Sequence, residues 1–257
     1  MTEKKDKCKK AIDKKSNYMA WYTFFYGLAY LPMKLLFPGK ALGVEHLPER
    51  GGYIFALNHR SGREIPLSFY AIPKFRHFIA KEEHYKSAFC RWIFPKLGVI
   101  AINRDKPDLS TIRKTVGYLR KGEIVGIFPE GTRNRDEDAD MLQFKNGTAL
   151  FALQAKVPVV PVYFYRKPRF FRKNYIYIGE PVYPSTESGP VNAEKIAEFG
   201  GKVRDALESA KGYLIDLMKD GGKMYKKEFK AEKKRMKARK REMKREAEIA
   251  GRGKDGH

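Results

Sequence analysis

Between Gly43 and Leu217, short runs of β-branched and aromatic residues alternate with longer stretches of helical character. The short runs predict strands at Tyr53–Leu57, His77–Ala80, Val99–Ile102, Ile124–Phe128, Val159–Phe164 and Tyr175–Ile178. The longer stretches predict helices at Ile65–Ala71, Leu109–Arg120, Gly147–Ala155 and Glu194–Met218. This alternation is typical of an α/β sandwich and argues against an all-β or an all-helical protein.

Length, cysteine content and charge set broad limits on the chain. Its 257 residues can bury one good core, which favours a single domain with extensions. The two cysteines, Cys8 and Cys90, cannot form a disulfide framework and lack the spacing of a metal site. The formal charge of +23 attracts anionic partners, but it does not choose among lipid headgroups, nucleic acid, acidic proteins and coenzyme A.

The N-terminal segment combines positive charge with aromatic side chains. Lysines crowd residues 1–15, and the apolar run Tyr18–Met33 follows. A helix over Tyr18–Leu31 would be about 21 Å long at ~1.5 Å per residue, which is shorter than the ~30 Å hydrocarbon core of a bilayer. We therefore expect this segment to lie in the membrane interface, with a buried helix of the core as the alternative. A signal peptide is disfavoured, because no small-residue cleavage site follows.

The composition changes again after Asp220. Residues Lys223–Arg245 hold 13 Lys and Arg against 3 Glu, a net charge of +10. Apolar residues recur there once per heptad, whereas a coiled coil needs two. We expect a solvated basic tail, helical or disordered, that contacts an anionic surface by charge. The chain thus divides into a basic arm with an interfacial helical segment, a central domain and a basic tail, at residues 1–42, 43–218 and 219–257.

His59 and Glu64 form the first polar cluster, directly after the predicted strand Tyr53–Leu57. A carboxylate five positions after an imidazole can hold one ring N–H across one turn and leave the other nitrogen basic. The pair is therefore a candidate general base. Ser61 and Glu64 also fit a capping box, in which the carboxylate accepts a backbone N–H, and the two roles are compatible.

The second polar cluster follows the predicted strand Ile124–Phe128 and consists of Glu130, Gly131, Thr132 and Arg133. Gly131 permits close approach of the backbone, Thr132 can donate a hydroxyl, and Arg133 can bind phosphate through its planar guanidinium. The alternative is an ion pair between Glu130 and Arg133 that only shapes the turn.

Together with two further segments, these clusters resemble the four motifs of the glycerolipid acyltransferase family. Gly98–Arg104 is similar to the second motif, a strand that ends in an arginine, and Val157–Pro161 is similar to the fourth, an apolar strand with prolines. The resemblance implies a mixed β-sheet flanked by helices, with His59 as general base and Glu64 as its partner. Most family members carry Asp where this chain has Glu64, so its carboxylate must reach the ring through one more methylene.

The resemblance also assigns substrate contacts. It implies that the third motif binds the acceptor, that Arg104 is a second phosphate anchor and that Lys81 lies in the substrate site. Pro158 and Pro161 are expected to shape the wall of the acyl-chain pocket, with plain strand packing as the alternative. No metal and no cofactor are implied.

These features lead us to expect an acyltransferase that moves a fatty acyl group from acyl-CoA or acyl carrier protein to the sn-2 hydroxyl of lysophosphatidate. Its other expected partner is a phospholipid surface, with the enzyme peripheral or monotopic on the cytoplasmic face of the cell membrane, and no nucleic acid is expected. Another lysophospholipid or glycerol 3-phosphate is the alternative acceptor. A non-catalytic relative that binds membrane or nucleic acid is the alternative from another class.

Overall fold

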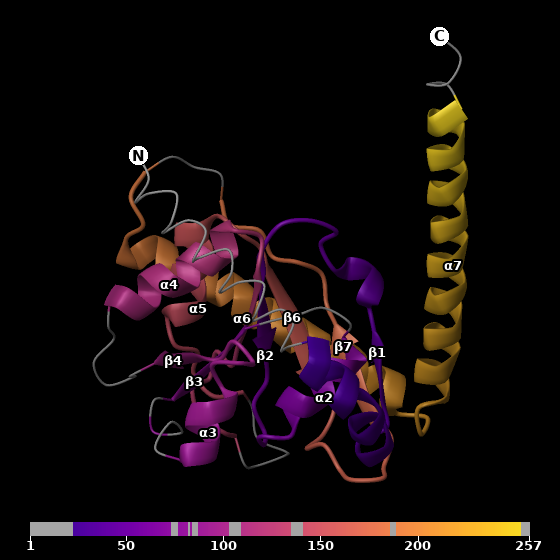
Figure 1. Cartoon of the computed structure of the whole chain (residues 1–257), viewed down its shortest axis with the longest axis horizontal. Coiled ribbons are helices and arrows are strands. Elements are labelled where there is room, and N and C mark those ends of the chain that lie inside the picture. The colour runs from indigo at the N-terminus through magenta and orange to yellow at the C-terminus, as the bar shows by residue number, and fades with distance from the viewer. Residues whose placement is uncertain are drawn as a thin grey trace.

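The computed structural model describes residues 23–72, 77–81, 83, 87–102, 109–134, 141–185 and 189–252 (Figure 1). The lysine-rich arm, Cys8 and the first part of the aromatic run lie outside the described residues. Within them, seven strands form one sheet in the order β1-β7-β6-β2-β5-β3-β4. Helices lie on both faces of this sheet, which confirms the predicted α/β class.

The strands are β1 (Gly39–Leu42), β2 (Tyr53–Leu57), β3 (His77–Lys81), β4 (Ile100–Ile102), β5 (Ile124–Ile127), β6 (Val159–Phe164) and β7 (Asn174–Ile178). Five of them, β2 to β6, run parallel, whereas β7 is antiparallel to β6 and β1 is parallel to β7. The sheet is therefore mixed, as the resemblance implies. The carboxyl ends of β2 and β5 meet the first residues of β1 and β7 at one edge, which we call the site edge.

The helices are α2 (Glu64–Ala71), α3 (Ala88–Ile93), α4 (Leu109–Arg120), α5 (Gly147–Ala155), α6 (Ala193–Met218) and α7 (Lys223–Arg252), with a 3-10 turn η1 (Val44–His46) and a further helix at residues 23–36. One core cluster includes Phe55 of β2 and Leu67 of α2. A second includes Ile54 of β2, Val116 of α4 and Phe151 of α5. Successive strand side chains enter opposite layers, so β2 is buried on both faces and its sequence is continuously apolar.

The sequence located β2, β6, α4 and α5 to the residue, and the other elements predicted between Gly43 and Leu217 have ends that differ by one residue. The helix expected over Tyr18–Leu31 instead continues to residue 36. The sequence analysis missed α3 and β1. The four residues of β1 pair with β7, so the sheet begins before the domain boundary that we expected at residue 43. An edge strand this short, with a glycine and a lysine in it, has too little alternation of apolar and polar residues to be recognised from the sequence.

The helix at residues 23–36 carries apolar side chains into solvent at the site edge. Its carboxyl end leads into β1, and the carbonyl oxygen of Leu36 accepts a hydrogen bond from the backbone N–H of Phe171 (2.7 Å) in the β6–β7 loop. Four of its large apolar side chains are more than half exposed, namely Phe24, Leu28, Leu31 and Leu35. Among the described residues, no helix combines the length and the hydropathy that crossing a bilayer requires.

The basic tail is helical, but its first turns pack on the domain. Tyr225 is fully buried, and its hydroxyl lies 2.6 Å from the carbonyl oxygen of Lys40 and 2.9 Å from that of Ile176. The carboxylate of Glu232 is also buried and accepts a hydrogen bond from the backbone N–H of Gly43 (2.9 Å). The expectation of a fully solvated tail is wrong for these turns, because a few buried side chains stand among the lysines and hold the helix.

The direction of α7 separates its far end from the site edge. The helix runs alongside β1, and ion pairs join Arg235 to Glu45 (2.8 Å) and Arg239 to Glu49 (2.6 Å) after that strand has ended. Because β1 is antiparallel to β2, this direction leads away from the carboxyl end of β2. The far end of α7 extends past the rest of the domain (Figure 1).

We expect Tyr225→Ala to lower the free energy of unfolding by about 3 to 5 kcal/mol, the cost of truncating a buried aromatic side chain. Urea unfolding would measure it. Met243→Ala is the matched control, because Met243 lies in the far half of α7 and is 52% exposed. We expect it to change stability by no more than ~0.5 kcal/mol. Equally small losses in both variants would mean that α7 is not part of the folded domain.

Candidate active site

Asn58 fixes the point at which the chain leaves β2. Its buried side chain pairs with the backbone of Phe164 at the end of β6. The Oδ1 atom accepts a hydrogen bond from the N–H of Phe164 (2.8 Å), and Nδ2 donates to the carbonyl oxygen of Phe164 (3.2 Å). The side-chain amide of Asn58 thus extends the pairing of β2 with β6 by one residue. This contact fixes the backbone position of the residue that precedes His59.

The backbone of His59 is held from both sides by the loop after β5. Its N–H donates to Oε1 of Glu130 (3.0 Å), and its carbonyl oxygen accepts from the N–H of Asn134 (2.8 Å). The imidazole stacks on Phe128, with ring centroids 3.9 Å apart and an interplanar angle of 23°. The structure therefore brings together two clusters that are 71 residues apart in sequence.

Glu64 faces the His59 ring from the first turn of α2. Its Oε2 atom lies 3.7 Å from Nδ1 of His59, and neither atom has a hydrogen-bond partner among the described residues. The other oxygen, Oε1, accepts from the backbone N–H of Ser61 (2.7 Å) and from its hydroxyl (3.0 Å). The carboxylate is fully buried, so these contacts fix its direction. One oxygen thus accepts the backbone N–H of Ser61, as the capping-box pattern predicted, although α2 begins at Glu64 with Arg63 at the N-cap. The other oxygen is directed at the imidazole.

Glu130 positions the His59 loop. Its side chain is 3% exposed, and its second oxygen, Oε2, accepts a hydrogen bond from the backbone N–H of Leu142 (3.2 Å). Both carboxylate oxygens are therefore engaged by backbone groups, and not by Arg133 as the turn-shaping alternative required. Sequence reasoning missed this role, because the need of the His59 N–H for an acceptor shows only once the loop is folded.

The remaining residues of the third motif lie beside the His59 loop. Gly131 has a φ of +69°, and a Cβ there would come within 3.0 Å of the aliphatic stem of Lys145. Thr132 and Arg133 are exposed. A Cβ on Gly62 would lie 3.6 Å from Nη2 of Arg133, so the guanidinium rests against the first motif. Glycine is thus required at position 131, and Arg133 presents its charge next to the first motif.

Two further arginines connect the first motif to β6 and to the β6–β7 loop. Arg60 donates to the hydroxyl of Tyr163 (2.9 Å), and Arg63 donates to the carbonyl oxygen of Pro168 (3.2 Å). The guanidinium of Arg63 also lies over the ring of Phe170, 4.6 Å from its centroid. These side chains hold the loop around His59 against β6 and the β6–β7 loop, a role that the sequence alone did not indicate.

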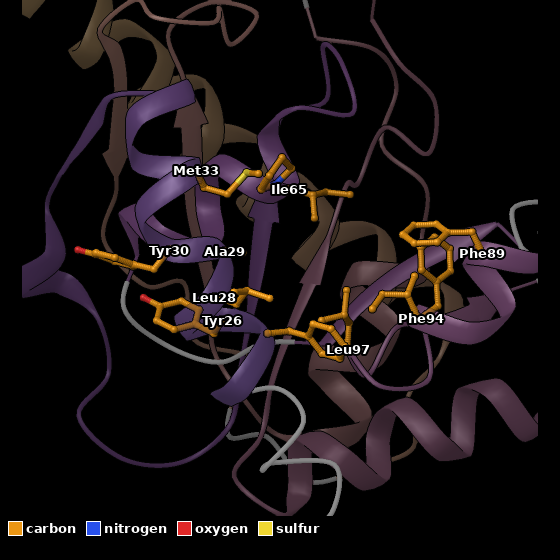
Figure 2. A pocket seen from close by; sticks show the side chains of 12 residues that line it. Tyr26, Leu28, Ala29, Tyr30, Met33, Ile65, Phe89, Phe94 and Leu97 are labelled. Carbon is orange, nitrogen blue, oxygen red and sulfur yellow. The ribbon is translucent and has the colours of Figure 1, made fainter.

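An apolar groove is lined in part by α2, the helix that carries Glu64. Its volume is about 530 Å³, and we call it the N-terminal groove. The lining comes from three segments: Phe25, Tyr26, Leu28, Ala29, Tyr30 and Met33 of the first helix, Ile65 and Pro66 of α2, and Phe89, Ile93, Phe94 and Leu97 in and after α3. Figure 2 shows Met33 and Ile65 at one end and Phe89 and Phe94 at the other. Ile65 follows Glu64 directly in sequence, so α2 contributes both to the groove and to the candidate catalytic pair.

The other predicted site residues have varied positions. Lys81 ends β3 at the site edge and lies 3.9 Å from Glu83 in an exposed ion pair. Arg104 lies outside the described residues. Pro158 and Pro161 do not line the N-terminal groove, and the ring of Pro161 instead lies 3.0 Å from where a Cβ on Gly179 would stand. Within the described part of the chain, no three His, Cys, Asp or Glu side chains gather into a group that could hold a metal ion.

Comparison with known proteins agrees with this geometry. The acyltransferase family model matches residues 40–165, which contain both polar clusters. A 1-acyl-sn-glycerol-3-phosphate acyltransferase from Bacillus subtilis is 29% identical over 185 residues, covering 69% of this chain and 90% of that protein. The chain contains a domain of the acyltransferase family at residues 40–165. Enzymes of the same name from Borreliella burgdorferi (31% identical) and Saccharomyces cerevisiae (29% identical) are matched over 54% and 60% of their length.

A solved structure supports the same assignment for this acyltransferase. It is that of the 1-acyl-sn-glycerophosphate acyltransferase PlsC from Thermotoga maritima, with a TM-score of 0.57 and 25% sequence identity. The superposition covers 79% of this chain and 82% of that protein. The likeness therefore extends beyond the motifs to most of the chain.

Proposed function

We propose that the protein transfers a fatty acyl group to the sn-2 hydroxyl of lysophosphatidate and so forms phosphatidate. The observation that carries the proposal is the facing pair of Nδ1 of His59 and Oε2 of Glu64, 3.7 Å apart beside an exposed arginine. The names of the related enzymes, which act on 1-acyl-sn-glycerol 3-phosphate, support the choice of acceptor.

In the proposed mechanism His59 acts as general base and then as general acid. Glu64 holds the proton on Nδ1, so that Nε2 accepts the proton of the acceptor hydroxyl as its oxygen attacks the thioester carbonyl. The oxyanion then collapses, the carbon–sulfur bond breaks, and the imidazolium returns its proton to the leaving thiolate. Glu64 stays ionised throughout and stabilises the imidazolium charge. No acyl-enzyme is needed.

The thioester donor is acyl-CoA or acyl carrier protein, which present the same reacting group. We propose no metal and no cofactor in the reaction. A direct test uses the full-length protein with lysophosphatidate and radiolabelled oleoyl-CoA, followed by thin-layer chromatography of the lipids. Labelled phosphatidate is the expected product. If no phosphatidate forms with either donor while glycerol 3-phosphate or another lysophospholipid is acylated, the proposed acceptor is wrong.

Arg133 is expected to bind the acceptor phosphate. Arg133→Ala should raise the KM for lysophosphatidate by roughly ten- to a hundredfold, because a hydrogen bond to a charged group contributes about 1.5 to 3 kcal/mol. Arg133→Lys keeps the charge without the planar fork and should restore only part of the affinity. Steady-state kinetics with each substrate varied in turn would measure both effects. A KM change confined to the acyl donor would reverse our assignment of the pockets.

We also propose that the site edge rests on the membrane surface. Apolar side chains from three segments are exposed along this edge: Phe24 and Leu28 of the first helix, Phe89 and Trp92 of α3, and Phe170 and Phe171 of the β6–β7 loop. Cations accompany them, including Lys96, whose Nζ lies 3.7 Å from the centroid of the Trp92 ring. Exposed aromatic and apolar residues with nearby lysines are typical of proteins that bind at the interface of a bilayer. This arrangement would let a membrane-resident acceptor reach His59 without leaving the lipid phase.

Changing Phe24, Leu28 and Trp92 together to serine should weaken binding to neutral phosphatidylcholine vesicles at least about tenfold, because the transfer of apolar surface into the interface is lost. The effect should persist in 0.5 M salt, where the Debye length is only about 4 to 5 Å. Vesicle sedimentation would measure it. The matched control is Lys244→Gln with Arg245→Gln, in the far half of α7. Loss of binding in the control alone would place the membrane contact on α7.

A further inference from the structure

A second apolar cavity lies on the face of the sheet opposite the N-terminal groove. Its volume is about 300 Å³, at the lower end of the ~300 to 1,000 Å³ range typical of ligand pockets. We call it the α5 cavity. Its walls are mostly aliphatic and come from strand ends and from α4, α5 and α6, as represented by Ile79, Ile102, Ile112, Ile127 and Ile196. Several of these side chains pack against the core cluster under α4 and α5, so the cavity continues an apolar layer.

One end of the α5 cavity is polar. Thr148 lines it, is 4% exposed, and has a hydroxyl oxygen with no hydrogen-bond partner among the described residues. Thr148 lies in the first turn of α5, and Asn146 at the start of the helix makes no side-chain cap. Lys145 lines the same end, with its aliphatic stem laid over Gly131. A residue with a buried, unpartnered hydroxyl, an uncapped helix N-terminus and a lysine thus line the same end of the cavity.

These groups favour a negative charge. The free N–H groups and the macrodipole of a helix N-terminus attract anions, and a buried hydroxyl without a partner costs free energy until an acceptor reaches it. Lys145 is the one cation among the described residues that line the cavity, so the site suits a single negative charge. The aliphatic walls favour a hydrocarbon chain over a wholly polar anion.

We propose that the α5 cavity binds a single-chain fatty acid, with its carboxylate at the first turn of α5 and its chain among the isoleucines. The carboxylate would accept hydrogen bonds from the hydroxyl of Thr148 and from the N–H groups of the helix, with Lys145 as counter-ion. The cavity is also lined by Phe128, on which the His59 ring stacks. A bound fatty acid would therefore touch the support of the candidate base without occupying the N-terminal groove.

Isothermal titration of the full-length protein with sodium decanoate, below its micelle concentration, tests the proposal. The wild type should bind about one equivalent. Thr148→Val keeps the shape but removes the hydroxyl, and it should weaken binding roughly tenfold or more. Thr148→Ser restores the hydroxyl and should bind within about threefold of the wild type. Ile112→Trp places a larger side chain in the cavity and should abolish binding.

Further variants test whether decanoate binds in the α5 cavity and not in the N-terminal groove, and whether its binding is separate from catalysis. Phe25→Ala alters the N-terminal groove and should leave decanoate binding unchanged. Lys145→Gln, at an exposed position, should weaken binding several-fold and replaces Thr148→Val if that variant does not fold. His59→Ala should bind decanoate as the wild type does, so failure of acyl transfer and failure of this proposal are separate results.

Three outcomes would overturn the proposal. One is the absence of decanoate binding to the wild type. Another is binding that Phe25→Ala weakens and Thr148→Val does not, which would place the fatty acid in the N-terminal groove. The third is tighter binding of decyl phosphate than of decanoate, which would make the polar end a phosphate site.

Discussion

His59→Ala is expected to lower kcat by about 10² to 10⁴-fold while the protein keeps its fold, because general base catalysis contributes a factor of this size. The loss of the ring also removes the stacking contact with Phe128, so a small decrease in thermal stability should accompany it. The measurement is single-turnover acyl transfer to lysophosphatidate, with circular dichroism to verify folding.

His46 provides a matched control for this substitution. Its Nδ1 atom lies 2.8 Å from the carbonyl oxygen of Ile178, and its Nε2 atom lies 3.1 Å from the carboxylate of Glu180, so it is also an imidazole with a carboxylate partner. It follows β1, however, and is therefore at the edge opposite His59. His46→Ala should leave kcat within a few-fold of the wild type. If His59→Ala retained wild-type activity, another group would have to be the base.

Glu64→Gln should have the second largest effect, a decrease in kcat of about 10² to 10⁴-fold with a KM for the acceptor within about threefold of the wild type. A glutamine side chain has one carbonyl oxygen, so it cannot face Nδ1 of His59 and the N–H of Ser61 with an acceptor atom at the same time. If its NH₂ group faces Nδ1 of His59, the ring proton loses its acceptor. If the amide is turned round, the NH₂ group meets the N–H of Ser61, which now donates to the carboxylate at 2.7 Å. Either orientation leaves a buried donor without an acceptor.

Ser61→Ala separates the two roles of Glu64. It removes the hydroxyl that donates to Oε1 but keeps the backbone N–H and the carboxylate that faces His59. We expect a loss of about 1 kcal/mol in stability, with kcat within a few-fold of the wild type. Steady-state kinetics and urea unfolding on both variants would show the contrast. Equal losses of stability with unchanged kcat would mean that Glu64 serves only as a cap.

Much of the fold could be predicted because its central strands are buried on both faces. The apolar runs of β2 and β6 predict strands in the interior of a sheet. Gly122 and Lys156, which have positive φ angles, mark the ends of the helices that precede β5 and β6. It could also be predicted that the side chains of His59 and Glu64 face each other, because the two residues are separated by a single turn.

Contacts between distant segments could not be predicted in the same way. The N-terminal groove is assembled from three segments, none of which is concave by itself. The docking of α7 depends on Tyr225 and Glu232, two residues in a helix whose composition otherwise indicates full solvation. Likewise, the use of Glu130 as an acceptor for the His59 N–H arises from the meeting of two loops, and the resemblance by itself implied only a contact with substrate.

The direction of α7 determines what its charge can reach. The helix has 30 residues and is therefore about 45 Å long at ~1.5 Å per residue. With the site edge seated on lipid, the far half of α7 would stand upright in the aqueous phase, several Debye lengths from the headgroups. Its lysines and arginines would then attract dissolved anions and acidic macromolecules instead of the bilayer beneath the active site. A protein fused after residue 257 would likewise be held by α7 away from the membrane surface on which the enzyme works.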